Sequence, residues 1–113
     1  MKSFCSILIS FLLILTINAQ DTMVYKTILS GHNGPVEAIS FSNDGHYFAS
    51  GGWDNSVRLY SVDSNHQFEH LRTLTGHHAA VICVAISSDN RYVATSSKDY
   101  TFSVYELETG KLR

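Results

Sequence analysis

The chain has 113 residues, of which 8 are Lys or Arg and 10 are Asp or Glu, giving a formal net charge of −2. A chain of this length forms one domain at most. The charge balance leaves no basic stripe of the kind that holds nucleic-acid phosphates, so we expect no nucleic-acid partner.

Residues 1–19 differ in composition from the rest of the chain. Lys2 supplies a positive charge, Phe4–Ile17 is almost wholly apolar, and small residues around Ala19 resemble a cleavage site. This is the pattern of a secretory signal peptide, and the apolar run is shorter than the ~18–20 residues that a spanning helix needs. We predict an apolar signal segment, helical or cleaved, over residues 1–19 and no membrane contact after cleavage. A signal anchor and a mis-assigned gene start are the alternatives.

The location of the protein depends on this segment. A cleaved signal places the protein in the secretory pathway or outside the cell, and a cytoplasmic location is the alternative. No Asn-x-Ser/Thr glycosylation sequon occurs in the sequence, so nothing else in it supports secretion. Without residues 1–19 the chain keeps 7 Lys or Arg against 10 Asp or Glu, a net charge of −3.

A lone strand at Met23–Leu29 is predicted ahead of a meander of four strands. Asp44-Gly45 supplies the residues that a tight hairpin turn needs, and Trp53-Asp54-Asn55 forms the next turn. Between these turns apolar and polar residues alternate, which is typical of strands. The four predicted strands of the meander are Val36–Phe41, Tyr47–Gly51, Ser56–Tyr60 and Phe68–Thr73.

The same pattern returns 45 residues later without an insertion, so that Gly31 corresponds to Gly76 and Asp54 to Asp99. A period of about 40–45 residues is typical of a repeat architecture. The residue after the aspartate is Tyr100 in the second copy, and a bulky residue tolerates a left-handed turn conformation poorly. We expect that turn to be strained or of a different type. The predicted strands of the second copy are Val81–Ile86, Tyr92–Ser96 and Thr101–Tyr105.

The last residues, Glu108–Arg113, resemble the run-up to another outer strand, and the sequence stops before a third Gly-His pair. We therefore expect the second copy to lack most of its last strand. The chain would then be a piece of a longer repeat array. A truncated or mispredicted gene product without an independent role is the alternative.

Each copy also carries a histidine, a hydroxyl, an aspartate and an aromatic residue at the same spacing. The aspartate follows the histidine by 22 residues, with the hydroxyl four residues before it and the aromatic six residues after it. This pattern resembles the WD40 repeat, over Met23–Arg113. The resemblance implies an all-β fold: an open partial propeller of two four-stranded antiparallel blades. Residues 20–113 would form this propeller, with 29–73 as blade 1 and 74–113 as blade 2.

In the WD40 family each blade is pinned by a buried His–Ser/Thr–Asp–Trp tetrad of hydrogen bonds. Tyrosine stands where the family has tryptophan in both copies, and Trp53-Asp54 lies in a turn rather than at the strand end. The tetrads that the resemblance implies are His32, Ser50, Asp54 and Tyr60 in blade 1, and His77, Thr95, Asp99 and Tyr105 in blade 2.

A histidine, a serine and an aspartate in one network also suggest a hydrolase. A nucleophilic hydroxyl must be exposed beside an oxyanion hole, whereas Ser50 and Thr95 fall within strands and lack a G-x-S-x-G elbow. The repetition of the grouping favours a structural fastener, so we expect no enzyme. His66 and His70 lie four residues apart but not on a helix, and no Cys-x-x-Cys or His-Glu-x-x-His motif accompanies them, so we expect no metal and no cofactor.

Trp53 is the strongest candidate for a partner-binding residue. It precedes the tetrad aspartate in a turn at the top rim of the propeller, where the resemblance implies that partner peptides dock, and exposed tryptophans are typical binding anchors. Its counterpart in blade 2 is Lys98, and Asn33, Glu37 and His78 are the neighbouring rim positions. The alternative is that Trp53 packs on its own blade over Gly51-Gly52.

The sequence therefore predicts a non-catalytic interaction or scaffold module whose partners are other proteins or peptides. They would bind at the rim or complete the propeller with further blades. Closed propellers use about 4–8 blades, and two blades cover only one of their interfaces. We accordingly expect self-association through the open blade faces as a further possibility.

Overall fold

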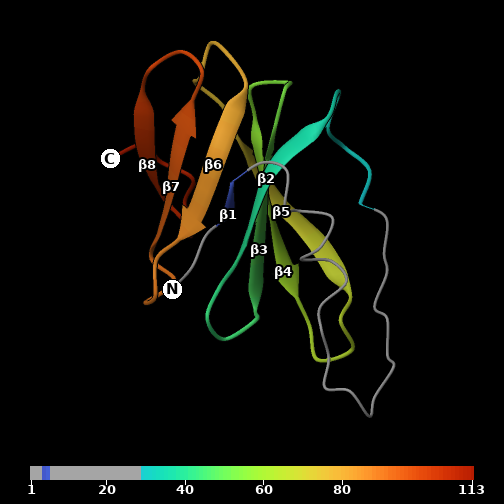
Figure 1. Ribbon diagram of the computed structural model, residues 1–113. Coiled ribbons are helices and arrows are strands. Elements are labelled where there is room, and N and C mark those ends of the chain that lie inside the picture. The colour runs from blue at the N-terminus through green and yellow to red at the C-terminus, as the bar shows by residue number, and fades with distance from the viewer. Residues whose placement is uncertain (1–3, 6–28) are drawn as a thin grey trace.

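The computed structural model describes residues 4–5 and 29–113, which form strands and turns (Figure 1). The predicted signal segment, except for Phe4–Cys5, and all but Leu29 of the predicted strand Met23–Leu29 lie outside the described residues. Phe4–Cys5 forms the short strand β1, which pairs antiparallel with the first strand of blade 1. A search of the described residues finds no helix of the length and hydropathy that crossing a membrane requires.

Blade 1 is an antiparallel meander whose strands follow one another in sequence order, and β1 adds a fifth strand at its inner edge. The predicted bounds differ from the observed ones by at most two residues. The first turn forms as the Asp-Gly pair predicts, because Gly45 has a φ of 77° and the Asp44 carboxylate accepts bonds from the Ser42 hydroxyl and the His46 N–H. The strands are β2 (Val36–Phe41), β3 (Tyr47–Gly52), β4 (Val57–Val62) and β5 (Phe68–Leu74).

Blade 2 repeats the meander with three strands, β6 (Val81–Ile86), β7 (Tyr92–Ser97) and β8 (Phe102–Glu106). The fourth strand is reduced to one bridge, in which Leu112 pairs with Tyr105. The Arg113 N–H also donates to the Val104 carbonyl at 2.8 Å, so the last residues begin to line the outer edge of β8. The second sheet thus has three full strands, and a single bridge stands in the place of the fourth.

The turn between β7 and β8 keeps the conformation of its counterpart in blade 1. Asn55 has a φ of 68° and Tyr100 a φ of 69°. Of the two expected alternatives, a different turn type does not occur, and the strained one does: Tyr100 adopts the left-handed conformation that a bulky residue disfavours. Since its side chain is fully exposed, only the backbone carries this strain.

The two sheets face each other across one apolar interface, with β6 against β2 and β3 (Figure 1). Small residues of blade 1 let the sheets approach: a Cβ atom on Gly51 would lie 2.6 Å from Val81 Cγ1 and 2.8 Å from Val84 Cγ2. Two hydrogen bonds join the blades within the described residues: a buried one from the Ile86 N–H to Ser40 Oγ at 3.2 Å, and an exposed one from Asn90 Nδ2 to Asp44 Oδ2 at 2.7 Å. The buried core here includes Ala38, Ala49, Val57, Leu59, Val81, Val84, Ile86 and Val93.

The outer face of blade 1 carries a second buried cluster. Aromatic rings of several strands pack on one another there, such as Phe48 and Phe68, which meet edge to face with ring centroids 5.5 Å apart. The outer face of blade 2 differs. Phe102 is 79% exposed there, whereas Val57, which occupies the same position in blade 1, is 1% exposed beneath blade 2.

Candidate functional site

In blade 1 the structure brings three of the four tetrad residues together. His32 Nδ1 lies 2.9 Å from Asp54 Oδ2, and His32 Nε2 lies 2.8 Å from Ser50 Oγ. Because an ionised carboxylate only accepts hydrogen bonds, Nδ1 carries a proton, and in the neutral imidazole Nε2 then accepts from the serine hydroxyl. The side chains of His32 and Asp54 are 6% and 15% exposed. This network ties the loop before β2 to strand β3 and to the turn after it.

Blade 2 contains the equivalent network. His77 Nδ1 lies 3.2 Å from Asp99 Oδ2, and His77 Nε2 lies 2.8 Å from Thr95 Oγ1. Asp99 also accepts a bond from the backbone N–H of His78 at 2.9 Å, as Asp54 does from the N–H of Asn33. The two rim positions next to the histidines therefore contribute their backbone to these networks and keep their side chains exposed.

The two tyrosines bond elsewhere. The Tyr60 hydroxyl accepts a bond from Arg58 Nε at 3.0 Å, and the Tyr105 hydroxyl donates to the Thr75 carbonyl at 3.1 Å. A tyrosine carries its polar atom at the far end of the ring. The hydroxyl of Tyr105 therefore reaches Thr75, in the loop before the Gly-His pair, and not the Thr95 hydroxyl of the network. Neither tyrosine hydroxyl therefore bonds to the histidine network of its own blade.

A hydroxyl two residues after each aspartate takes part instead. Ser56 Oγ donates to Asp54 Oδ1 at 2.8 Å, and Thr101 Oγ1 donates to Asp99 Oδ1 at 2.5 Å. The sequence analysis missed both residues. The signal was present, since Asp-x-Ser and Asp-x-Thr recur at the repeat spacing and short polar side chains at this spacing favour turns.

These bonds keep both carboxyl groups ionised. Although burial raises the pKa of Asp54, hydrogen bonds from the Asn33 N–H and the Ser56 hydroxyl lower it to about 2. The Thr101 hydroxyl and the His78 N–H likewise hold the pKa of Asp99 well below its usual range. Each blade therefore carries a fixed negative charge under its rim at neutral pH.

The networks are structural in their geometry. Ser50 and Thr95 are both buried, and a nucleophilic hydroxyl has to meet its substrate. Among the residues the structure describes, no group of three or more His, Cys, Asp or Glu side chains is arranged to hold a metal ion. In this geometry the side chains of the two networks bond to one another and to the backbone.

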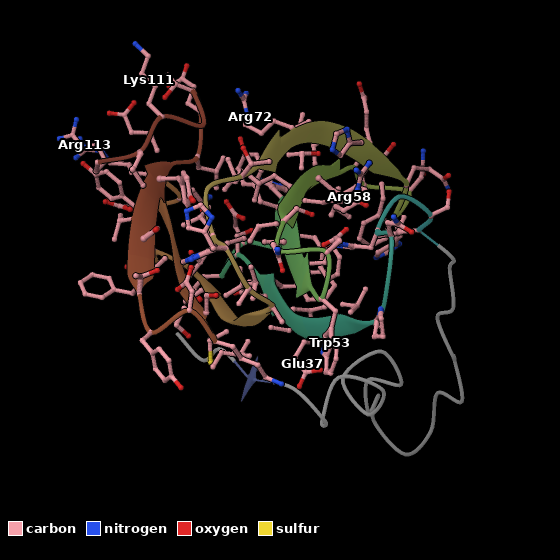
Figure 2. The ribbon with its side chains drawn as sticks, turned by 90° about the horizontal axis from the view of Figure 1, so that it is seen from above. Glu37, Trp53, Arg58, Arg72, Lys111 and Arg113 are labelled. Atoms are coloured by element: carbon pink, nitrogen blue, oxygen red, sulfur yellow. The ribbon has the colours of Figure 1, made fainter. Side chains whose placement is uncertain are left out.

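A group at the surface, which we call the rim cluster, consists of the exposed Trp53 and Lys98 and the half-buried Glu37. Trp53 Nε1–H donates to Glu37 Oε2 at 3.0 Å, and Lys98 Nζ lies 4.5 Å from the centre of the Trp53 ring. Trp53 is 53% exposed. Figure 2 shows Glu37 and Trp53 side by side, at the opposite end of the molecule from Lys111 and Arg113. The cluster joins the two blades, because Lys98 comes from blade 2.

Trp53 is attached to its own blade through Glu37 and the loop before β2. Besides the bond to Glu37, its Cβ would lie 3.6 Å from a Cβ atom on Gly34. The backbone holds the ring at the rim, since the Trp53 N–H donates to the Pro35 carbonyl at 2.9 Å. The tryptophan ring therefore remains open to solvent on the upper edge of the two blades.

Comparison with known proteins agrees with this architecture. The family model "WD domain, G-beta repeat" matches residues 23–61 and 68–106. The chain is 47% identical over 36 residues to the periodic tryptophan protein 2 homolog of Schizosaccharomyces pombe, which is 32% of this chain and 4% of that protein. It is 46% identical over 43 residues to eukaryotic translation initiation factor 3 subunit I of Drosophila virilis, which is 38% of this chain and 13% of that protein.

A third relative is the U4/U6 small nuclear ribonucleoprotein PRP4 of Saccharomyces cerevisiae, 31% identical over 48 residues, which is 42% of this chain and 10% of that protein. The chain thus spans a small part of the length of these relatives. The two matches to the family model together cover more than half of the chain, and each falls on strands of the observed sheets. The chain belongs to the WD40 repeat family.

Proposed function

We propose that the chain is a non-catalytic interaction module that binds a protein or peptide partner at the rim cluster. The observation that carries this proposal is a tryptophan that is 53% exposed yet held in place by Glu37 and Lys98. Tryptophan is enriched among the residues that dominate binding energy. A ring that is already fixed also loses little conformational freedom when a partner binds.

The names of the relatives support a role in protein assemblies. One is named as a subunit of a translation initiation factor and another as a small nuclear ribonucleoprotein. The histidine networks do not support a hydrolase, because their hydroxyls, those of Ser50 and Thr95, are buried where a substrate does not reach them. A scaffold role therefore accounts for both the buried networks and the exposed rim.

Replacing Trp53 with Ala tests the proposal. Peptides would be selected from a display library on the full chain, and their affinities measured for the wild type, Trp53→Ala and the control Leu112→Ala, which removes another exposed apolar side chain. We expect Trp53→Ala to weaken binding by about 30-fold, the effect of a typical anchor residue, and Leu112→Ala to leave it unchanged. Equal binding by Trp53→Ala, with its circular dichroism unchanged, would contradict a rim site.

A second candidate function is the completion of a propeller through the outer face of blade 2. In blade 1 the residues at the equivalent positions are covered by blade 2, so the internal interface shows how such a face is buried. A second copy of the chain and further repeats of a longer polypeptide both supply a blade of this kind. Ser96 stands where blade 1 has Gly51, so a blade on this face needs a smaller side chain than Val81 opposite that position.

A further inference from the structure

The rim carries more negative than positive charge. Asp54 and Asp99 lie under it as carboxylates that the surrounding hydrogen bonds keep ionised, and Glu37 adds a third carboxylate at the surface. Lys98 is the one cation of the rim cluster. A partner group that binds between these residues therefore meets a negative potential, which favours a cation.

Lys98 already occupies the place that such a cation would take. Its ammonium nitrogen lies 4.5 Å from the centre of the Trp53 ring, within the range of a cation–π contact. Among residues 29–113 it takes part in no ion pair, and its side chain is exposed. A contact of this kind at an exposed site is weak, so a better cation can displace it.

Glu37 lies at the edge of the Trp53 ring, beside the indole nitrogen. Its Oε2 accepts the Trp53 indole N–H at 3.0 Å, which fixes the carboxylate beside the ring, and within the described residues it too makes no ion pair. The remaining lone pairs of the carboxylate can therefore accept hydrogen bonds from a ligand. A flat cation that stacks on the ring and donates in its own plane fits both neighbours at once.

We propose that the rim cluster binds an arginine side chain of the partner, which stacks on Trp53 in place of Lys98 and donates to Glu37. This inference rests on the proposed function, in which the rim is the partner site. Guanidinium is planar, stacks on aromatic rings and pairs with carboxylates through a fork of N–H groups, whereas ammonium does so as a point charge. Lys98 is then an internal competitor that lowers the affinity of the site.

The single tryptophan of the chain makes the test direct, because its fluorescence reports on Trp53 alone. The full chain is titrated with acetyl-Gly-Arg-Gly-amide and with the matched lysine and glutamate peptides. We expect the arginine peptide to change the Trp53 fluorescence saturably, the lysine peptide to change it less, and the glutamate peptide to leave it unchanged. Lys98→Gln should tighten arginine binding by about two- to fivefold, the weight of an exposed cation–π contact, and Glu37→Gln should weaken it by a similar factor.

Two variants control for the charge changes. Arg91→Gln removes an exposed cation that lies over another ring, that of Tyr92, at 5.3 Å, and Glu69→Gln removes an exposed carboxylate of β5. Neither should alter the titration. The inference is overturned if the arginine peptide leaves the fluorescence of both the wild type and Lys98→Gln unchanged, or if Lys98→Gln weakens its binding. Binding of the glutamate peptide that depends on Lys98 would also overturn the inference. The proposed rim site is tested separately, by the peptide affinity of Trp53→Ala.

Discussion

One carboxylate in each blade accepts hydrogen bonds from two segments of the chain, the loop before the first strand and the turn that carries the carboxylate. Asp54 accepts from the imidazole of the preceding loop, from the N–H of Asn33 and from the hydroxyl of Ser56 in its own turn. Each such bond contributes about 0.5–1.5 kcal/mol net, and a donor left without its acceptor costs about 1–3 kcal/mol. The aspartate therefore holds the loop and the turn in register, and Asp99 does the same in blade 2.

This role predicts a pH-dependent stability. The pKa of Asp54 is about 2 in the folded chain and 3.8 in its reference state, so the unfolded chain binds the proton more tightly. The stabilisation is complete above the higher value and is lost as the pH falls from about 4 towards 2. Asp54→Asn should lower the free energy of unfolding by about 1–3 kcal/mol at pH 7 and flatten its decline below pH 4.

Urea unfolding of the full chain at pH 7, 4 and 2.5 measures this difference. Glu108→Gln is the control, because this carboxylate is exposed and its removal should leave the pH dependence as it is in the wild type. If Asp54→Asn and the wild type lose stability in parallel on acidification, the carboxylate does not carry the effect assigned to it.

Sheet packing depends on a position without a side chain. Gly51 of β3 lies opposite Val81 and Val84 of β6, closer than a Cβ atom permits. The equivalent position in β7, Ser96, belongs to a face that no other blade covers and is half-buried. The same strand position is thus under steric restriction in one blade and free of it in the other.

Gly51→Ala should accordingly destabilise the chain by about 1–3 kcal/mol through overpacking of the interface. The matched change in blade 2, Ser96→Ala, should alter the free energy of unfolding by less than about 0.5 kcal/mol. Thermal melts followed by circular dichroism compare the two variants. Equal melting temperatures for Gly51→Ala and the wild type would mean that the blades do not pack as closely as described.

The outer face of blade 2 forms one side of the molecule and is exposed. Phe102 is 79% exposed on this face, and the outer edge of β8 is paired only at the last residues of the chain. An exposed apolar patch on a sheet marks an association surface or an aggregation hazard. The predicted signal segment and the secretory location stay predictions, since the structure describes only Phe4–Cys5 of residues 1–19.

Phe102→Ser should therefore reduce self-association of the full chain. Sedimentation velocity at increasing concentration should show the wild type associating and Phe102→Ser shifted towards the monomer. Leu71→Ser, which removes an exposed apolar side chain from β5 of blade 1, should behave as the wild type. A wild type that stays monomeric over the whole concentration range, like Phe102→Ser, would leave the open face without a role in self-association.

The sequence by itself determined the strands, the turns and the repeat. Alternation of apolar residues and turn formers such as Asp44-Gly45 act over a few neighbouring residues, so their outcome can be predicted without knowing the rest of the fold. Trp53 could be placed at the rim for the same reason, because the turn that carries it is defined by the strands on either side.

Only the tertiary structure decided what each side chain touches. Val57 and Phe102 occupy the same position in the repeat, yet one is covered and the other exposed, because burial depends on whether another blade lies against the sheet. The hydroxyls of Tyr60 and Tyr105 likewise found different partners. The contact of Lys98 with Trp53 joins residues 45 positions apart in the chain, and their distance was set by the packing of the two sheets, which no local pattern encodes.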